Sequence, residues 1–204
     1  MKKKEKFSKL FSKSNSINIL SASRVFLFRA RDIWFVVGVP IFFYDKLSWS
    51  FTEVGSFMAS WIIFYGIIQS LAPKLLKIFY VNNFSENEQA FIWAINLLLI
   101  IACLGILSYT HDYNGYLICM GLFLFGFIFA INSSIHSYLI LALAKKNDVT
   151  LDVGFYYMAN AMGRLLGCII SGFSYQIAGL IGCFVFAGIF LFFCSVFSFY
   201  LKSY

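Results

Sequence analysis

Charged residues are scarce in this chain, and its longest segments almost lack them. Only 12% of the 204 residues are Asp, Glu, Lys or Arg, against 61% hydrophobic residues, and the mean hydropathy is +0.81. Soluble domains carry about 25% charged residues, so this composition excludes a soluble globular domain. Segments without charge cover residues 54–73, 90–110, 113–144 and, with Arg164 as the exception, 153–201.

Sequence motifs of soluble enzymes and metal sites are also missing. The chain contains no Gly-rich phosphate loop, no HExxH motif and no Ser–His–Asp set, and its five cysteines form no CxxC pair. We therefore expect no metal and no cofactor, and we interpret the cysteines as small apolar residues. An intramembrane enzyme is the least favoured class, because His136, Asp32 and the serines lack a nucleophile-and-base spacing.

The apolar segments themselves predict an all-α membrane protein. A helical span needs about 20 apolar residues, so the last segment is long enough for two spans joined by a turn at 176–182. With the opening segment 17–44, the sequence predicts six transmembrane helices. A β-barrel would need segments of about 10 residues that alternate polar and apolar, which these continuous Leu-, Ile- and Phe-rich runs do not.

The net charge of +7 is concentrated at the N-terminus, where residues 1–13 hold six lysines against one glutamate. Such a tail beside a span is a topology determinant and does not indicate nucleic-acid binding. Further lysines follow the second predicted span (positions 74 and 77), the fourth (145 and 146) and the sixth (202). With six spans, all of these positions lie on the same side of the membrane as the N-terminus. We therefore predict a basic cytoplasmic tail (1–16) and a six-helix bundle (17–202) in the cell (inner) membrane, with both ends cytoplasmic.

The opening span is unusual because it carries Arg24, Arg29, Arg31 and Asp32. Charge inside a bilayer costs a few kcal/mol per residue on insertion scales, so it is rarely kept without a role. The simplest interpretation is that Arg24 extends to the headgroups and that Arg29 pairs with Asp32, three residues away. Arg31 lies too deep to reach the headgroups, so we expect it to face a cavity. The Val-Gly-Val-Pro stretch at 37–40 predicts a kink near the outer end of this span.

The fifth span presents two faces. One is a ridge of small residues every four positions, typical of close helix packing: Ala159, Gly163, Gly167 and Ser171. The other is polar and includes Asn160 and Arg164. A lone arginine near the middle of the membrane requires an anion, from the protein or from a substrate. The sixth span is expected to be polar nowhere and to face lipid.

Polar pairs one helical turn apart occur in two further spans. They are Asn132 with His136 in the fourth span, and Tyr65 with Gln69 in the second. These pairs can have a purely structural role, in which they hydrogen-bond between packed helices. Alternatively, they line a water-accessible cavity. Arginines, an aspartate, a histidine and amides that point inward are typical of a transporter that holds a polar, anionic solute.

Six spans with both ends cytoplasmic resemble one half of a major facilitator superfamily transporter, which consists of two such halves. Four stretches also resemble the C-terminal half of ArsJ-type organoarsenical efflux permeases: INILSASRVFLFRARDIWFVVGVPIFF, SWSFTEVGSFMASWIIFYGIIQSLAP, FAINSSIHSYLILALA and NAMGRLLGCIISGFSYQIAGLIGC. The resemblance implies export of 1-arseno-3-phosphoglycerate by alternating access, as part of arsenate resistance. It also implies a partner, either a separate N-terminal six-helix half or a second copy of the chain.

The resemblance adds Arg24 to the site, since Arg24, Arg31 and Arg164 match the family's pattern, whereas Arg29 departs from it. The candidate substrate-binding residues are therefore Arg31, Arg164, Arg24, Asn160, His136, Asn132, Gln69 and Tyr65. Asp32 is the candidate for proton coupling. Two alternatives stay open: another exporter of the superfamily, for a sugar phosphate or a drug, and a truncated remnant or assembly subunit that does not transport.

Overall fold

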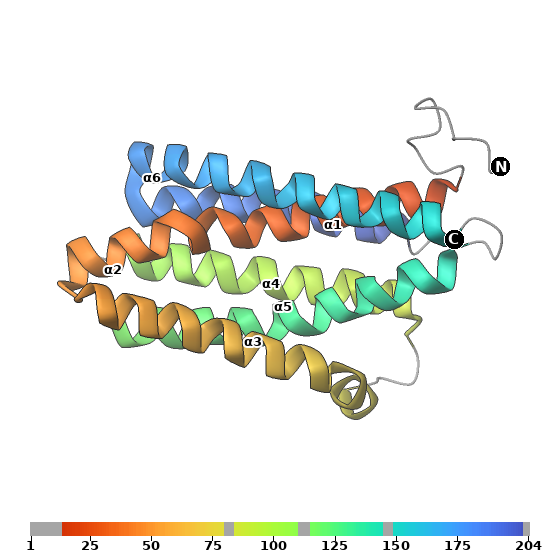
Figure 1. Ribbon diagram of the computed structural model, residues 1–204, viewed down its shortest axis with the longest axis horizontal. Helices are drawn as coiled ribbons and strands as arrows, with labels where there is room; N and C mark the ends of the chain where they lie inside the picture. Colours follow the sequence, from red (N-terminus) through yellow and green to blue (C-terminus); the bar gives the residue numbers. More distant parts are fainter. Residues whose placement is uncertain (1–13, 80–83, 110–114, 145–148, 202–204) are drawn as a thin grey trace, which may run out of the picture.

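A computed structural model describes residues 14–79, 84–109, 115–144 and 149–201, and every regular element in these ranges is helical (Figure 1). Four of the helices, α3 to α6, are long and apolar enough to cross a membrane. The predicted all-α, multi-pass membrane class is therefore confirmed. Residues 1–13 of the basic tail lie outside the described residues. The same holds for positions 83, 114 and 147, which fall in three of the predicted loops between spans.

The opening segment is a continuous helical run of three parts: α1 (Asn15–Ile33), the π-helical turn η2 (Trp34–Gly38) and α2 (Val39–Leu47). Pro40 has no N–H to donate and its ring crowds the preceding turn, so the helix widens directly before it. In the widened turn the Val37 backbone N–H donates to Ser171 Oγ of α6 at 3.2 Å. The predicted kink takes the form of a π turn, which begins two residues after Asp32.

The next two helices, α3 (Phe51–Phe79) and α4 (Glu86–Tyr109), each begin with a reciprocal cap. Ser50 N–H donates to Glu53 Oε2 at 2.8 Å, and Glu53 N–H donates back to Ser50 Oγ at 3.3 Å. Ser85 and Glu88 repeat the arrangement at 2.8 and 3.4 Å. The S-x-x-E spacing thus satisfies backbone N–H groups that a helix leaves unpaired, and it fixes where both helices start.

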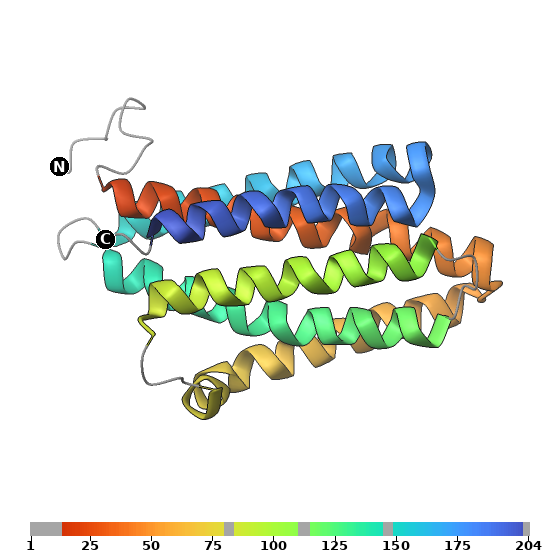
Figure 2. The ribbon, with the colours of Figure 1, turned by 180° about the vertical axis from the view of Figure 1, so that it is seen from behind.

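The last helices are α5 (Gly115–Leu143) and α6 (Val149–Leu201). The backbone of α6 leaves the helical region at Ala178 (φ −145°) and Gly179 (φ 60°). A positive φ of this size favours glycine, which has no Cβ to clash. Residues 149–177 form a first arm and residues 180–201 a second arm, which runs back beside the first (Figures 1 and 2).

Helix α1 packs against both arms of α6. A Cβ added at Gly163 of the first arm would lie 2.5 Å from the carbonyl oxygen of Val25. On the second arm, Ser198 Oγ lies 2.9 Å from Ser23 Oγ. The expectation that the sixth span is polar nowhere and faces lipid is wrong: Ser195 and Ser198 are buried, because small hydroxyl side chains allow close approach and find hydrogen-bond partners there.

Aromatic rings join the opening segment to α3 and α5. The ring of Trp34 meets Trp61 and Phe125 edge-on, with centroids 5.7 and 5.2 Å apart. Trp61 Nε1–H donates to the Leu122 carbonyl at 2.8 Å, so this large side chain is both packed and hydrogen-bonded. Helix α3 nevertheless lies at the edge of the bundle, since only 11% of the residues in its most apolar stretch are buried by the rest of the protein. The side of the bundle beside α3 is therefore not covered by the other described helices.

Candidate functional site: an arginine cluster in the membrane interior

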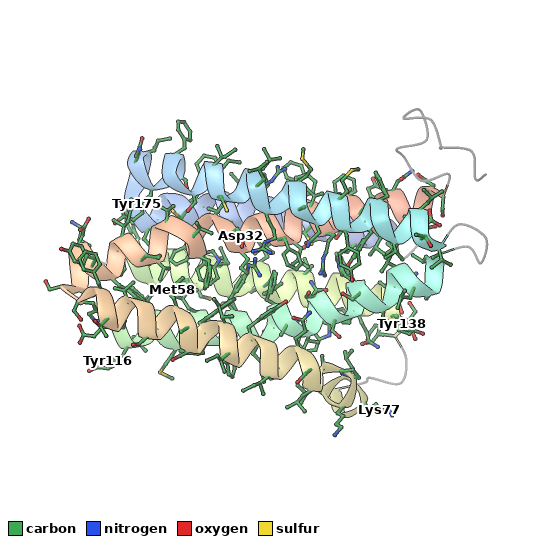
Figure 3. All side chains as sticks on the ribbon, in the orientation of Figure 1. Asp32, Met58, Lys77, Tyr116, Tyr138 and Tyr175 are labelled. Carbon is green, nitrogen blue, oxygen red and sulfur yellow. The ribbon has the colours of Figure 1, made fainter. Side chains whose placement is uncertain are left out.

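Asp32, near the C-terminal end of α1, is the centre of the site, and Figure 3 shows it about midway along the bundle. Its side chain is only 2% exposed. One carboxylate oxygen accepts a hydrogen bond from Arg31 Nε at 2.7 Å. The other accepts one from Arg164 Nε, on the first arm of α6, at 3.3 Å. A single buried carboxylate therefore bridges two helices that are distant in sequence.

Arg24 joins this group through the ring of Phe28. The guanidinium carbons of Arg24 and Arg31 lie 4.0 and 5.0 Å from the centroid of that ring. Arg24 Nη1 also donates to the carbonyl oxygen and to Oγ of Ser133 on α5, at 2.9 and 3.0 Å. Arg24 is only 4% exposed, so the expectation that it reaches the headgroups is wrong. We call Arg24, Arg31, Asp32 and Arg164 the arginine cluster.

The arginine cluster carries excess positive charge. It contains three guanidinium groups and one carboxylate, which leaves a formal surplus of two charges. The other described acidic residues lie near helix ends: Asp45, Glu53, Glu86, Glu88 and Asp152. Uncompensated charge is costly in a low-dielectric interior, so the cluster has a strong electrostatic preference for an additional anion.

Arg29 does not belong to the cluster. Its guanidinium carbon lies 4.9 Å from the Phe190 ring centroid and 5.4 Å from that of Phe26, between α1 and the second arm of α6. The expected pairing of Arg29 with Asp32 is therefore wrong. A spacing of three residues makes such a pair possible, but Arg29 lies against the rings of Phe26 on α1 and Phe190 on the second arm, and Asp32 pairs with two other arginines.

Arg31, which was expected to face a cavity, and Arg164, which was expected to need an anion from the protein or a substrate, share Asp32. They differ in exposure. The Arg31 side chain is 9% exposed, and that of Arg164 is 57% exposed. Arg164 contacts Asp32 through Nε. Within the described part of the chain its terminal nitrogens have no partner, so this planar fork is available to a carboxylate or phosphate from outside the bundle.

The ridge of small residues lets α6, which carries Arg164, approach α1, which carries the rest of the arginine cluster. Ala159, Gly163, Gly167 and Ser171 are all buried. A Cβ added at Gly167 would lie 2.9 Å from the Cβ of Asp32 and 3.1 Å from the Arg29 carbonyl oxygen. Glycine at 167 therefore permits the close approach of α1 to α6, which places Asp32 within reach of Arg164 three residues earlier.

The other predicted site residues lie at different depths. Tyr65 is half-buried, and its hydroxyl lies 3.5 Å from Ser133 Oγ, next to Arg24. Asn160 is half-buried and its side-chain oxygen has no partner among the described residues. Gln69 is half-buried and, in that same part of the chain, makes no hydrogen bond or ion pair with the arginine cluster.

Asn132 and His136 on α5 are completely buried, with no exposed surface. Both polar atoms of the Asn132 side chain and both ring nitrogens of His136 lack a hydrogen-bond partner among the described residues. Buried polar groups in proteins are nearly always hydrogen-bonded, so internal water is the simplest partner for them.

Sequence reasoning missed two parts of this arrangement. The first is Ser133, which holds Arg24 through both its carbonyl and its hydroxyl. The second is the π turn Trp34–Gly38, which turns the Val37 N–H toward Ser171. The only available signals were the serine beside Asn132 and the proline at 40, neither of which specifies a partner. Across the described ranges, no group of three His, Cys, Asp or Glu side chains is arranged to hold a metal.

Comparison with known families supplies the context for an arginine cluster between membrane helices. The family model of the Major Facilitator Superfamily matches residues 21–203, nearly the whole chain. The chain belongs to the Major Facilitator Superfamily. No curated protein and no solved structure gave a significant match. As a member of this superfamily the chain is a multi-pass membrane protein of the transporter type, and the superfamily is not an enzyme family.

Proposed function

We propose that the chain is a six-helix half of a transporter that moves an organic anion across the cell membrane by alternating access. The observation that carries the proposal is the surplus of two positive charges in the arginine cluster, midway through an apolar bundle. Guanidinium groups form paired hydrogen bonds with carboxylates and phosphates, so an anion with one of these groups fits the cluster best.

The exposure of Arg164 supports a second six-helix unit as partner, either a separate N-terminal half or a second copy. The side chain of Arg164 is 57% exposed at the depth of Asp32. A charged side chain does not remain in contact with lipid hydrocarbon at that depth, so a water-filled cavity must lie in front of it. A second bundle packed beside α3 and the first arm of α6 would enclose such a cavity.

The expected roles of the other residues of the proposed site depend on how deeply each one is buried. Tyr65, Asn160 and Gln69 are half-buried and would line the cavity next to the arginines. Asn132 and His136 have no exposed surface, so their contact with a substrate would require the helices to separate. Such rearrangement is part of alternating access, in which the binding site opens to one side of the membrane at a time.

For the substrate we propose 1-arseno-3-phosphoglycerate, exported as part of arsenate resistance. Its phosphate and arsenate groups supply the negative charge that the arginine cluster lacks. A sugar phosphate is the alternative with the same chemistry. An uncharged drug would leave the surplus charge in place, so the cluster disfavours it.

Arginine-to-alanine variants test the anion site. We would measure binding of 3-phosphoglycerate, a stable analogue, to the purified chain in lipid nanodiscs by calorimetry. Arg31→Ala and Arg164→Ala should each weaken binding about ten- to a hundredfold, the value of a charge-assisted hydrogen bond in a partly dry site. Arg→Lys at either position should also weaken it, because lysine keeps the charge but loses the planar fork.

The matched control is Arg29→Ala, which removes an arginine from the same helix but outside the cluster. Binding by this variant should be unchanged. If Arg31→Ala and Arg164→Ala fold normally and bind 3-phosphoglycerate as the unmodified chain does, the anion site does not exist. In cells, loss of arsenate resistance in the same two variants, with loss of arsenical export, would support the arsenical substrate over other phosphates.

A further inference from the structure

Asp32 is bonded to two of the arginines that the preceding proposal assigns to the substrate anion. It contacts Arg31 and Arg164 at the same time, each with a different carboxylate oxygen. A guanidinium group recognises a protein carboxylate and a substrate carboxylate or phosphate in the same way, through paired N–H donors. Asp32 is therefore chemically equivalent to a substrate anion already present in the site.

The two contacts of Asp32 are not equal. The contact with Arg31 is short, at 2.7 Å, and both side chains are buried. The contact with Arg164 is longer, at 3.3 Å, and the Arg164 side chain is 57% exposed. Hydrogen bonds to charged groups weaken with length and with access of water, so the Arg164–Asp32 contact is the weaker one. An anion that arrives from outside the bundle therefore meets Arg164 before Arg31.

Packing decides which partner moves. A Cβ at Gly167 would be only 2.9 Å from the Asp32 Cβ, so α6 lies directly against Asp32 and leaves it no room to shift toward α6. Arg164 has a long, exposed side chain with several rotatable bonds. Exchange of the anion at Arg164 therefore requires a side-chain rotation of the arginine, and Asp32 stays paired with Arg31.

We propose that Asp32 is an internal counter-ion that the substrate anion replaces at Arg164, and that it thereby sets the affinity and charge preference of the site. The proposal rests on the anion site proposed above and adds a competitor to it. With Asp32 ionised, a dianion neutralises the surplus of two charges in the cluster, whereas a monoanion leaves one. The substrate class is thus an anion that carries at least two negative charges, held in part by an arginine that Asp32 releases.

Asp32→Asn tests the competition, since asparagine has nearly the same shape but no charge. Phenylglyoxal modification of Arg164, followed by mass spectrometry of the chain in nanodiscs, reports whether that side chain is engaged. In the unmodified chain 3-phosphoglycerate should protect Arg164. In Asp32→Asn it should protect at about a tenfold lower concentration, because the competing carboxylate charge is gone. Glu86→Gln, the same change at an exposed position at the start of α4, should leave the protecting concentration unchanged.

Each outcome separates this inference from the proposed function. Equal protecting concentrations in the unmodified chain and in folded Asp32→Asn would overturn the competition and leave the anion site intact. No protection of Arg164 in either protein would overturn the anion site itself. If Asp32→Asn does not fold, the difference infrared spectrum of the unmodified chain, with isotope-labelled aspartate, replaces it. Addition of 3-phosphoglycerate should then shift the carboxylate stretch of a buried aspartate, and an unchanged spectrum would contradict the exchange.

Discussion

At the scale of residues, the four arginines of the chain lie in three different environments. Arg24 is enclosed and bonded to Ser133, Arg31 and Arg164 share a carboxylate, and Arg29 rests on aromatic rings. The environments differ in what they offer the guanidinium group, since the buried Nε atoms of Arg24 and Arg29 have no hydrogen-bond partner among the described residues, whereas Arg31 and Arg164 each bond Asp32 through Nε. We therefore expect substitutions at these positions to have different consequences for stability and for binding.

Arg24→Ala should reduce stability more than Ser133→Ala does. The arginine variant removes two charge-assisted hydrogen bonds to Ser133 and the contact with the Phe28 ring, a loss of about 3 kcal/mol. Ser133→Ala removes only the hydroxyl acceptor and keeps the backbone carbonyl, a loss of about 1 kcal/mol. Thermal unfolding of both variants in the same detergent measures the difference. Equal midpoints for the two variants would show that Arg24 is not held by the backbone carbonyl.

The sequence located the charged residues of the membrane interior, but not how they pair. Arg24 and Arg31 are seven residues apart, about two helical turns, and both contact the Phe28 ring. Spacing also allowed Arg29 to pair with Asp32, whereas the partner of Asp32 on α6 is 132 positions away in sequence. Long arginine side chains reach several neighbours, so their partners depend on how helices pack, and periodicity does not encode that.

At the scale of elements, the bundle depends on how closely the first arm of α6 approaches α1. Gly163→Ala would place a methyl group 2.5 Å from the Val25 carbonyl oxygen, which is backbone and does not yield easily. We expect a loss of about 1–3 kcal/mol, the usual cost of overpacking. Gly172→Ala, on the same arm, is the control because an added Cβ there meets nothing within 4 Å.

The two alanine variants can be compared by thermal unfolding and by yield in the membrane fraction. Alanine is the better helix former, so Gly172→Ala should be unchanged or slightly stabilised. A lower midpoint for Gly163→Ala alone supports the close contact of α1 with α6. Equal midpoints would mean that the helices can separate locally at no measurable cost.

Element positions were easier to predict than element shapes. Hydropathy located the apolar helices because bilayer thickness fixes their length, and the turn predicted within 176–182 includes the non-helical residues Ala178 and Gly179. The π turn before Pro40 was predicted only as a kink. Its form depends on a hydrogen bond from Val37 to Ser171 of another helix, which a local pattern does not contain.

At the scale of the whole molecule, the two ends of the bundle differ in lysine content. The start of α1 and the end of α6 lie at the same end (Figures 1 and 2), and Lys77 lies toward that end in Figure 3. Lys74 is near Lys77 on α3. At the opposite end, where α2 is followed by α3, the described residues include one lysine, Lys46. Because cytoplasmic ends of membrane proteins carry more lysine and arginine, we propose that the end with Lys74 and Lys77 is cytoplasmic.

Cysteine labelling tests this orientation together with the number of spans. In a variant without the five native cysteines, single cysteines at Ser48 and Asn114 should react with a membrane-impermeant maleimide in intact cells. Cysteines at Asn83 and Asn147 should react only after the cells are permeabilised, since six spans place these positions on the other side. Ser48 is exposed at the end of α2, so a failure to label it would indicate the reverse orientation. Labelling of Asn83 in intact cells would rule out six spans with a cytoplasmic N-terminus, because positions 48 and 83 are separated by the single apolar helix α3.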